Sequence, residues 1–310
     1  MKKRMLLVGC LALLVIAACQ VEVGPGDRAW NDWVAPYRHD LDVGGYRLHY
    51  IDLGQGEPIL LIHGFADSTY TFHENVKPLL AAGYRVILVD QPGLGRSEVP
   101  PPYFVYSIEN IAGEIVKFAD RLSLQSFIVG GSSMGGGISF YLALNYPECV
   151  RKVIALDPVT YHIDRQGWMP LAARTGLNRV GAKFANREAV RFILRDVCFN
   201  DRLVNDAMVD EYARPINKPG FTDALAKLTT QYFSPEFDNM TRRYPQLRQP
   251  VLAIWGEQDH WVSPAQGKQL VLAAPHVRLR YIPECGHLSQ QERPELVNPE
   301  ILRFLNGVQR

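Results

Sequence analysis

Short aliphatic runs alternate with amphipathic stretches along most of the chain. Five runs of three to five consecutive apolar residues predict strands buried on both faces of a sheet: 59–62, 86–89, 127–129, 153–156 and 251–255. Between them, apolar residues recur at helical spacing in three segments: 71–82, 108–122 and 135–146. Strands that alternate with helices favour parallel pairing with right-handed crossovers. The pattern therefore predicts an α/β fold with a mostly parallel central sheet flanked by helices.

One long interval interrupts this alternation. Residues 158–249 contain no comparable aliphatic run, although helical patterns are present at 186–197 and 221–232. Several prolines separate these patterns from one another. We therefore predict a helical lid at 158–249, inserted into a core that is formed by residues 45–157 and 250–310.

The overall composition is that of an ordinary globular protein. Apolar residues make up 47% of the 310 residues and charged residues 21%, which excludes a disordered chain and a polytopic membrane protein. Lys and Arg together number 33, and Asp and Glu number 32, which gives a formal net charge of +1. No basic block follows the first residues, so the chain lacks the electrostatic pattern of a nucleic-acid-binding protein.

The first residues have the features of an export signal. Three basic residues, 2–4, precede 14 uncharged residues, 5–18. This run is shorter than the ~20 residues that a helix needs to cross a bilayer. We interpret residues 1–18 as a signal peptide and residues 19–44, which contain several glycines, as a tether to the folded part.

The end of this signal, Ile16-Ala17-Ala18-Cys19, resembles the lipobox of bacterial lipoproteins. The resemblance implies that Cys19 becomes the mature N-terminus and carries acyl chains, which would hold the protein on a membrane. Gln20 stands where lipoproteins of enteric bacteria carry an aspartate as the inner-membrane retention signal. The expected location is therefore the cell envelope, at the outer membrane. The alternative is an ordinary cleaved signal or an uncleaved anchor, with an incidental cysteine.

A candidate nucleophile lies in Gly131-Ser132-Ser133-Met134-Gly135, which fits the G-x-S-x-G pattern of a nucleophile elbow. The motif directly follows a predicted strand and opens a predicted helix. A turn of this kind exposes the serine hydroxyl at the helix N-terminus, and glycines suit its strained, closely packed backbone. Ser133 is thus the predicted nucleophile. The alternative is a Gly/Ser-rich turn that only packs a helix against the sheet.

A serine nucleophile needs a base, and the base needs a third group that orients it. His287 lies in a loop after the last predicted strand, 277–282, and is the candidate base. Asp259, which follows another predicted strand, is the preferred acid, with Asp157 and Glu257 as alternatives. The resulting order of serine, aspartate and histidine is typical of hydrolases rather than of the two common protease types.

A tetrahedral intermediate also needs hydrogen-bond donors for its oxyanion. His63-Gly64-Phe65 follows the predicted strand at 59–62 and supplies a loop beside the serine. The backbone amides of Phe65 and Met134 are the predicted donors. His63 is expected to shape this loop rather than to transfer protons.

Five motifs resemble those of the α/β-hydrolase superfamily and follow the same order: 63–65, 90–97, 131–136, 256–259 and 286–287. The resemblance covers about residues 45–306 and implies an α/β-hydrolase fold with a Ser-His-Asp triad. In relatives the second of these motifs is a structural loop. Related dehalogenases and epoxide hydrolases place an aspartate at the elbow, where this chain has Ser133.

Together these features predict a membrane-anchored serine hydrolase that cleaves carboxylic (acyl) esters, either an esterase or a lipase. Apolar residues of the lid predict an acyl pocket, or else simply pack the lid on the core: Trp168, Met169, Phe192, Ile193 and Phe199 among them. One alternative is a carbon–carbon bond hydrolase of the meta-cleavage type, which uses the same triad. Another alternative is a non-catalytic surface lipoprotein. An amidase, thioesterase or perhydrolase is also compatible with the motifs.

No cofactor or metal is expected, because the eight His and five Cys residues show no ligand spacing such as H-E-x-x-H or C-x-x-C. Three cysteines, Cys149, Cys198 and Cys285, would follow the signal and the lipidated residue. An odd count in an exported protein allows one disulfide or none, and the sequence leaves both open.

Overall fold

The computed structural model describes residues 22–162 and 186–307. The predicted signal peptide, Cys19 and the lid residues Trp168 and Met169 lie outside these ranges. Within the described ranges, no helix combines the length and the apolar character needed to cross a bilayer.

A single eight-stranded sheet forms the centre of the molecule, in the order β1-β2-β4-β3-β5-β6-β7-β8. The strands are β1 (Arg38–Asp42), β2 (Arg47–Leu53), β3 (Pro58–Ile62), β4 (Arg85–Val89), β5 (Phe127–Ser132), β6 (Val150–Leu156), β7 (Val251–Gly256) and β8 (Arg278–Ile282). β2 pairs antiparallel with both β1 and β4, and every other pairing is parallel. The predicted α/β fold with a mostly parallel sheet is therefore confirmed.

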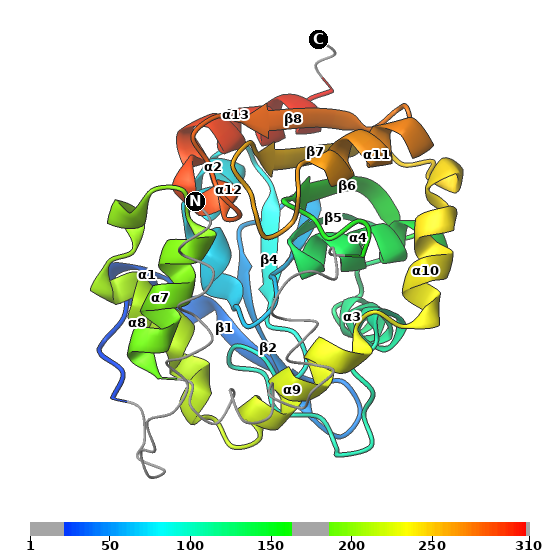
Figure 1. Ribbon diagram of the computed structural model, residues 1–310. Coiled ribbons are helices and arrows are strands. Elements are labelled where there is room, and N and C mark those ends of the chain that lie inside the picture. The colour runs from blue at the N-terminus through cyan, green and yellow to red at the C-terminus, as the bar shows by residue number, and fades with distance from the viewer. Residues whose placement is uncertain (1–21, 163–185, 308–310) are drawn as a thin grey trace.

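Helices cover both faces of the sheet (Figure 1). The flanking helices of the core are α2 (His73–Ala81), α3 (Ile108–Arg121), α4 (Met134–Asn145), α11 (Ala265–Ala273), α12 (Ser289–Glu292) and α13 (Pro294–Leu305). Successive side chains of β3 point to opposite faces, so Leu60 and Ile62 join one hydrophobic cluster and Ile59 and Leu61 join the other. This two-sided burial explains why the parallel strands read as continuous aliphatic runs.

The prediction of a tether over residues 19–44 is wrong for its second half. Residues 28–42 form α1 (Arg28–Val34), a 3₁₀ turn η1 (Ala35–Tyr37) and β1, which pairs with β2 at the edge of the sheet. Asp27 caps α1 by accepting a hydrogen bond from the amide of Trp30 (3.0 Å). β1 is mostly polar and exposed, so backbone pairing stabilises it and no aliphatic run marks it in the sequence.

Among the described residues between β6 and β7, in the region predicted as a lid, there are four helices. They are α7 (Arg187–Val197), α8 (Asp206–Ala213), α9 (Phe221–Gln231) and α10 (Pro235–Arg242), with 3₁₀ turns at η3 (Asp201–Leu203), η4 (Arg214–Asn217) and η5 (Tyr244–Gln246). α7 and α9 match the two helical patterns of the sequence, whereas the eight-residue helices α8 and α10 are too short to show one.

A half-buried lysine, Lys218, connects this region to the core. Lys218 Nζ donates hydrogen bonds to the carbonyl oxygens of Leu94 (3.1 Å), Gly95 (3.0 Å) and Ser97 (2.6 Å). These carbonyls belong to the loop that follows β4, within the second hydrolase-like motif. One ammonium group thus donates to three carbonyls of this loop, and the Leu94 carbonyl also accepts from the Ser97 amide (3.0 Å).

Candidate active site

Ser133 lies in a sharp turn between β5 and α4, with φ 54° and ψ −117°. Non-glycine residues rarely adopt a positive φ, and such strain is concentrated at functional sites. The turn is possible because two glycines allow close approach: a Cβ on Gly135 would collide with the carbonyl of Ile62, and one on Gly131 would collide with the backbone of Gly135. The backbone is also held by the hydrogen bond from the Ser133 amide to the carbonyl of Leu156 (2.8 Å).

The three residues predicted as a triad meet in one hydrogen-bonded chain. His287 Nε2 is 2.8 Å from Ser133 Oγ, and His287 Nδ1 is 2.7 Å from Asp259 Oδ2. A carboxylate can only accept, so Nδ1 carries the proton and Nε2 is free to accept from the serine hydroxyl. Asp259 Oδ1 accepts from the amides of Trp261 (2.8 Å) and Val262 (2.9 Å), which fixes the carboxylate plane.

His287 is buried, and its surroundings favour the protonated ring. Burial alone opposes the imidazolium, but the charge and hydrogen bond of Asp259 outweigh this effect and raise the pKa of His287. The carboxylates of Asp157 and Glu292 act in the same direction. The site is therefore built to stabilise the imidazolium that forms when a serine gives up its proton.

The two alternative acids do not contact the imidazole. Asp157 uses its carboxylate to join other segments, because Oδ1 accepts from the Gly256 amide (2.8 Å) and Oδ2 accepts from the Ser289 amide (2.9 Å). Burial, and then the charge of Asp259, raise the pKa of Asp157 to about 7. Glu257 is exposed. The structure thus brings Asp259, and neither alternative, into hydrogen-bond contact with the imidazole.

The predicted oxyanion donors flank the serine. Met134 is the first residue of α4, so its amide has no acceptor within the helix. A Cβ placed on Gly64 would lie 3.2 Å from Ser133 Cβ and 3.8 Å from Ser133 Oγ. The loop that presents the Phe65 amide therefore packs directly against the nucleophile.

His63 shapes this loop, as expected. Its Nε2 accepts from the Gln91 amide (3.0 Å), so its Nδ1 carries the proton and donates to the carbonyl of Gly64 (2.8 Å). Burial lowers the pKa of His63, which keeps the ring neutral. A neutral ring with both nitrogens engaged holds the loop and has no free site for proton transfer.

Glu292 is a supporting residue that the sequence did not reveal. Its buried carboxylate accepts from the amides of Gly286 (3.0 Å) and Phe199 (2.7 Å). It thereby joins the loop that carries His287 to the segment after α7. A single glutamate in a short helix carries no motif, so only the fold identifies it. The cysteines Cys149, Cys198 and Cys285 are all free thiols in the structure.

Comparison with known proteins identifies the family of the chain. The sequence matches the family described as alpha/beta hydrolase fold over residues 57–294. A relative named uncharacterized hydrolase YugF, from Bacillus subtilis (strain 168), is 30% identical over 264 residues, which cover 85% of this chain and 94% of the relative. The 2-hydroxy-6-oxo-6-phenylhexa-2,4-dienoate hydrolase of Burkholderia cepacia is 28% identical over 274 residues, 87% of this chain and 95% of that enzyme.

Solved structures show the same fold. A variant of the meta-cleavage product hydrolase CumD is similar with a TM-score of 0.73 at 24% identity, over 87% of this chain and 98% of that chain. The chain belongs to the α/β-hydrolase family. Within that family it is a hydrolase enzyme.

Proposed function

We propose that the protein is a serine hydrolase that cleaves carboxylic (acyl) esters. Ser133 Oγ attacks the ester carbonyl while His287 Nε2 takes the hydroxyl proton, and the amides of Phe65 and Met134 hold the oxyanion. His287 then protonates the leaving alcohol, which departs and leaves an acyl group on Ser133. Water attacks this acyl-enzyme with His287 again as the base, and the carboxylic acid is released.

The hydrogen-bonded chain from Ser133 through His287 to Asp259 is the observation that carries this proposal. Within the described residues, the charges that act most strongly on His287 belong to carboxylates, namely those of Asp259, Asp157 and Glu292.

A second candidate is carbon–carbon bond hydrolysis, which the relatives favour. The Burkholderia cepacia enzyme bears the name of a dienoate hydrolase, and a hydrolase of Comamonas testosteroni, 28% identical over 274 residues, is named for dioate substrates. These substrates carry carboxylates, whereas a simple acyl ester is neutral. This contrast makes the two reactions separable by experiment.

The proposed function includes a lipid anchor at Cys19, supported by the export pattern. Gly24 lies against α8, since a Cβ there would collide with the side chain of Asp210. Gly24 is five positions after Cys19 in the sequence, which is at most about 18 Å of extended chain. An acylated Cys19 would therefore keep the α8 side of the molecule close to the membrane surface, in the cell envelope at the outer membrane.

The helix next to α8 presents apolar side chains to solvent. α7 packs against α8, and its Phe192 and Ile193 are 58% and 39% exposed. The last residue of α7, Val197, accepts a hydrogen bond from the His287 amide (3.0 Å). Exposed apolar groups on the helix that ends beside the His287 loop support a substrate drawn from a lipid phase.

The test is an assay of the detergent-solubilised protein and its Ser133→Ala variant on p-nitrophenyl esters of graded acyl length, beside a ring-cleavage dienoate. Ester turnover that disappears in the variant is expected, with the preferred chain length separating an esterase from a lipase. Turnover of the dienoate alone would establish the second candidate instead. Labelling with radioactive palmitate, compared with Cys19→Ser, tests the anchor independently.

A further inference from the structure

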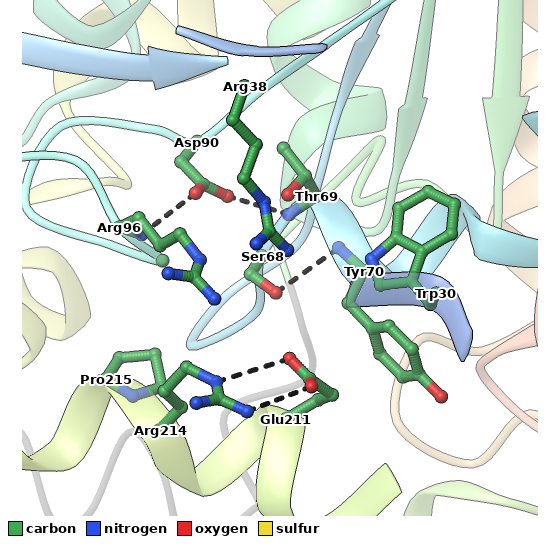
Figure 2. A pocket seen from close by; sticks show the side chains of 11 residues that line it. Trp30, Arg38, Ser68, Thr69, Tyr70, Asp90, Arg96, Glu211, Arg214 and Pro215 are labelled. Carbon is green, nitrogen blue, oxygen red and sulfur yellow. Dashed lines mark hydrogen bonds and ion pairs between the residues drawn. The ribbon is translucent and has the colours of Figure 1, made fainter. Parts of the chain in front are cut away.

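Three arginines surround a small cavity that the proposed reaction does not use. Arg38 comes from β1, Arg96 from the loop after β4, and Arg214 from η4 beside the lid helices (Figure 2). The cavity has a volume of about 20 Å³, and Ser68 and Thr69 also line it. This exceeds the roughly 10–15 Å³ that one water molecule requires. No member of the triad lines the cavity.

The carboxylates nearest to these arginines are already engaged. Glu211 accepts from Arg214 Nη2 (3.1 Å), from the Asp27 amide (3.1 Å) and from Asn31 Nδ2 (2.5 Å). Asp90, which also lines the cavity, is buried. Its Oδ2 contacts His49 Nδ1 (2.8 Å) and accepts from the Arg96 amide (2.8 Å), and its Oδ1 accepts from the Thr69 amide (2.7 Å).

Arg38 and Arg96 therefore lack carboxylate partners within the described residues. Arg38 donates one hydrogen bond, to the side chain of Asn31, and its Nε is buried without a partner. Burial, and then the positive charge of Arg96, lower the pKa of Arg38 to about 10. The charges of Glu211 and Asp90 act in the opposite direction but do not restore the ordinary pKa of Arg38. Two cations thus face the cavity, and these two carboxylates offset their mutual repulsion only in part, which leaves a favourable place for a further anion.

We propose that this cavity binds a tetrahedral oxyanion of the phosphate class. The three guanidinium groups approach from different elements, and the hydroxyls of Ser68 and Thr69 add further donors. A carboxylate offers two oxygens in one plane, whereas a phosphate offers three or more oxygens in different directions, which suits this arrangement. The small volume admits one oxyanion group, either a free ion or the phosphate of a larger molecule.

The expected consequence is a bridge between three parts of the fold. Arg38 belongs to the N-terminal edge strand, Arg96 to a core loop, and Arg214 to the segment between α8 and α9. An anion held by all three stabilises the folded protein, because it binds the folded state and finds no such site in the unfolded chain. The site is independent of the reaction at Ser133.

The experiment is thermal unfolding of the full-length protein in detergent, with inorganic phosphate compared with chloride at equal ionic strength. Phosphate at about tenfold above its Kd should raise Tm by about 2–4 °C. The Arg96→Gln variant should lose this shift. The matched control is Arg47→Gln, since Arg47 is an exposed arginine paired with Glu98, and it should keep the shift.

A second measurement is the Tm of Arg96→Gln in chloride alone. It should be equal to or higher than that of the parent protein, because the substitution removes a repulsion and breaks no ion pair. A lower Tm in chloride would show that Arg96 has a partner within the fold and would overturn the proposal. An equal phosphate shift in all three proteins would overturn it too, as a general salt effect.

The source of the phosphate group is distinguished with sn-glycerol 3-phosphate in the same assay. If this monoester shifts Tm as inorganic phosphate does, and Arg96→Gln abolishes both shifts, the site accepts the phosphate of a headgroup. If only inorganic phosphate acts, the site is specific for the free ion. If neither acts on the parent protein, the cavity is not an oxyanion site.

Discussion

Replacing Asp259 by asparagine changes one atom of the proposed triad and keeps its size. The Asp259 Oδ1 atom accepts from two backbone amides, those of Trp261 and Val262. In Asp259→Asn the amide oxygen keeps these two bonds, which directs the NH₂ group at His287 Nδ1. Two donors cannot face each other, so the imidazole changes tautomer and places its proton on Nε2, only 2.8 Å from Ser133 Oγ.

The serine then has no acceptor for its proton. Loss of the correct tautomer in a Ser-His-Asp site lowers kcat about 10⁴-fold, which corresponds to about 5 kcal/mol of transition-state stabilisation. The fold loses one charge-assisted hydrogen bond, a cost of about 1–3 kcal/mol. We therefore expect a variant that is folded and nearly inactive.

The assay is kcat on the preferred ester at pH 8, with circular dichroism and thermal unfolding to confirm the fold. Asp157→Asn is the matched control, because that carboxylate binds the amides of Gly256 and Ser289 and not the imidazole. It should lose about 1–2 kcal/mol of stability and keep kcat within about tenfold. If Asp259→Asn retained a tenth of the activity while Asp157→Asn lost nearly all of it, the acid would be Asp157 and the reasoning refuted.

Three further predictions concern the base, the elbow and the Lys218 contact. The pKa of His287 is raised above the ordinary 6.5, and the base must be neutral to act. Activity should therefore fall as the pH drops through this raised pKa. A kcat/KM that is half-maximal below pH 6.5 would contradict this prediction. Gly135→Ala should abolish soluble folded protein because its Cβ meets the carbonyls of Ile62 and His63. Gly113→Ala, in α3 with nothing within 4 Å, should stabilise the fold by about 0.5–1 kcal/mol in denaturant titration. Lys218→Met should lower the free energy of unfolding by about 2–3 kcal/mol, since it removes three hydrogen bonds and leaves the carbonyls of Gly95 and Ser97 without a donor. An unchanged urea midpoint would refute that role.

The pattern of the chain predicted those elements whose burial is uniform. β5 and β7 are buried at every position, so their aliphatic runs identify them directly. β1 is mostly polar and exposed, and its stability comes from backbone pairing to β2 rather than from its own side chains. An edge strand of this kind has no signature in the sequence, which is why its residues read as part of a tether.

The local motifs predicted the elbow, because G-x-S-x-G encodes the close backbone approach around Ser133 within five residues. No local motif identified the acid of the triad. Asp157 and Asp259 both follow parallel strands and both end near His287, so spacing along the chain could only rank them. Which carboxylate reaches the imidazole depends on the turn after β7, where the amides of Trp261 and Val262 orient Asp259.

The sequence by itself thus determined the order of strands and helices, the serine at the elbow and the candidates for base and acid, since each depends on short-range pattern. The tertiary structure decided what depends on residues far apart in the chain. It placed Asp259 against His287, put Glu292 behind the histidine loop, and gathered Arg38, Arg96 and Arg214 around one cavity. Such groupings arise only when the chain folds, because long-range packing, and no local rule, sets the distances between them.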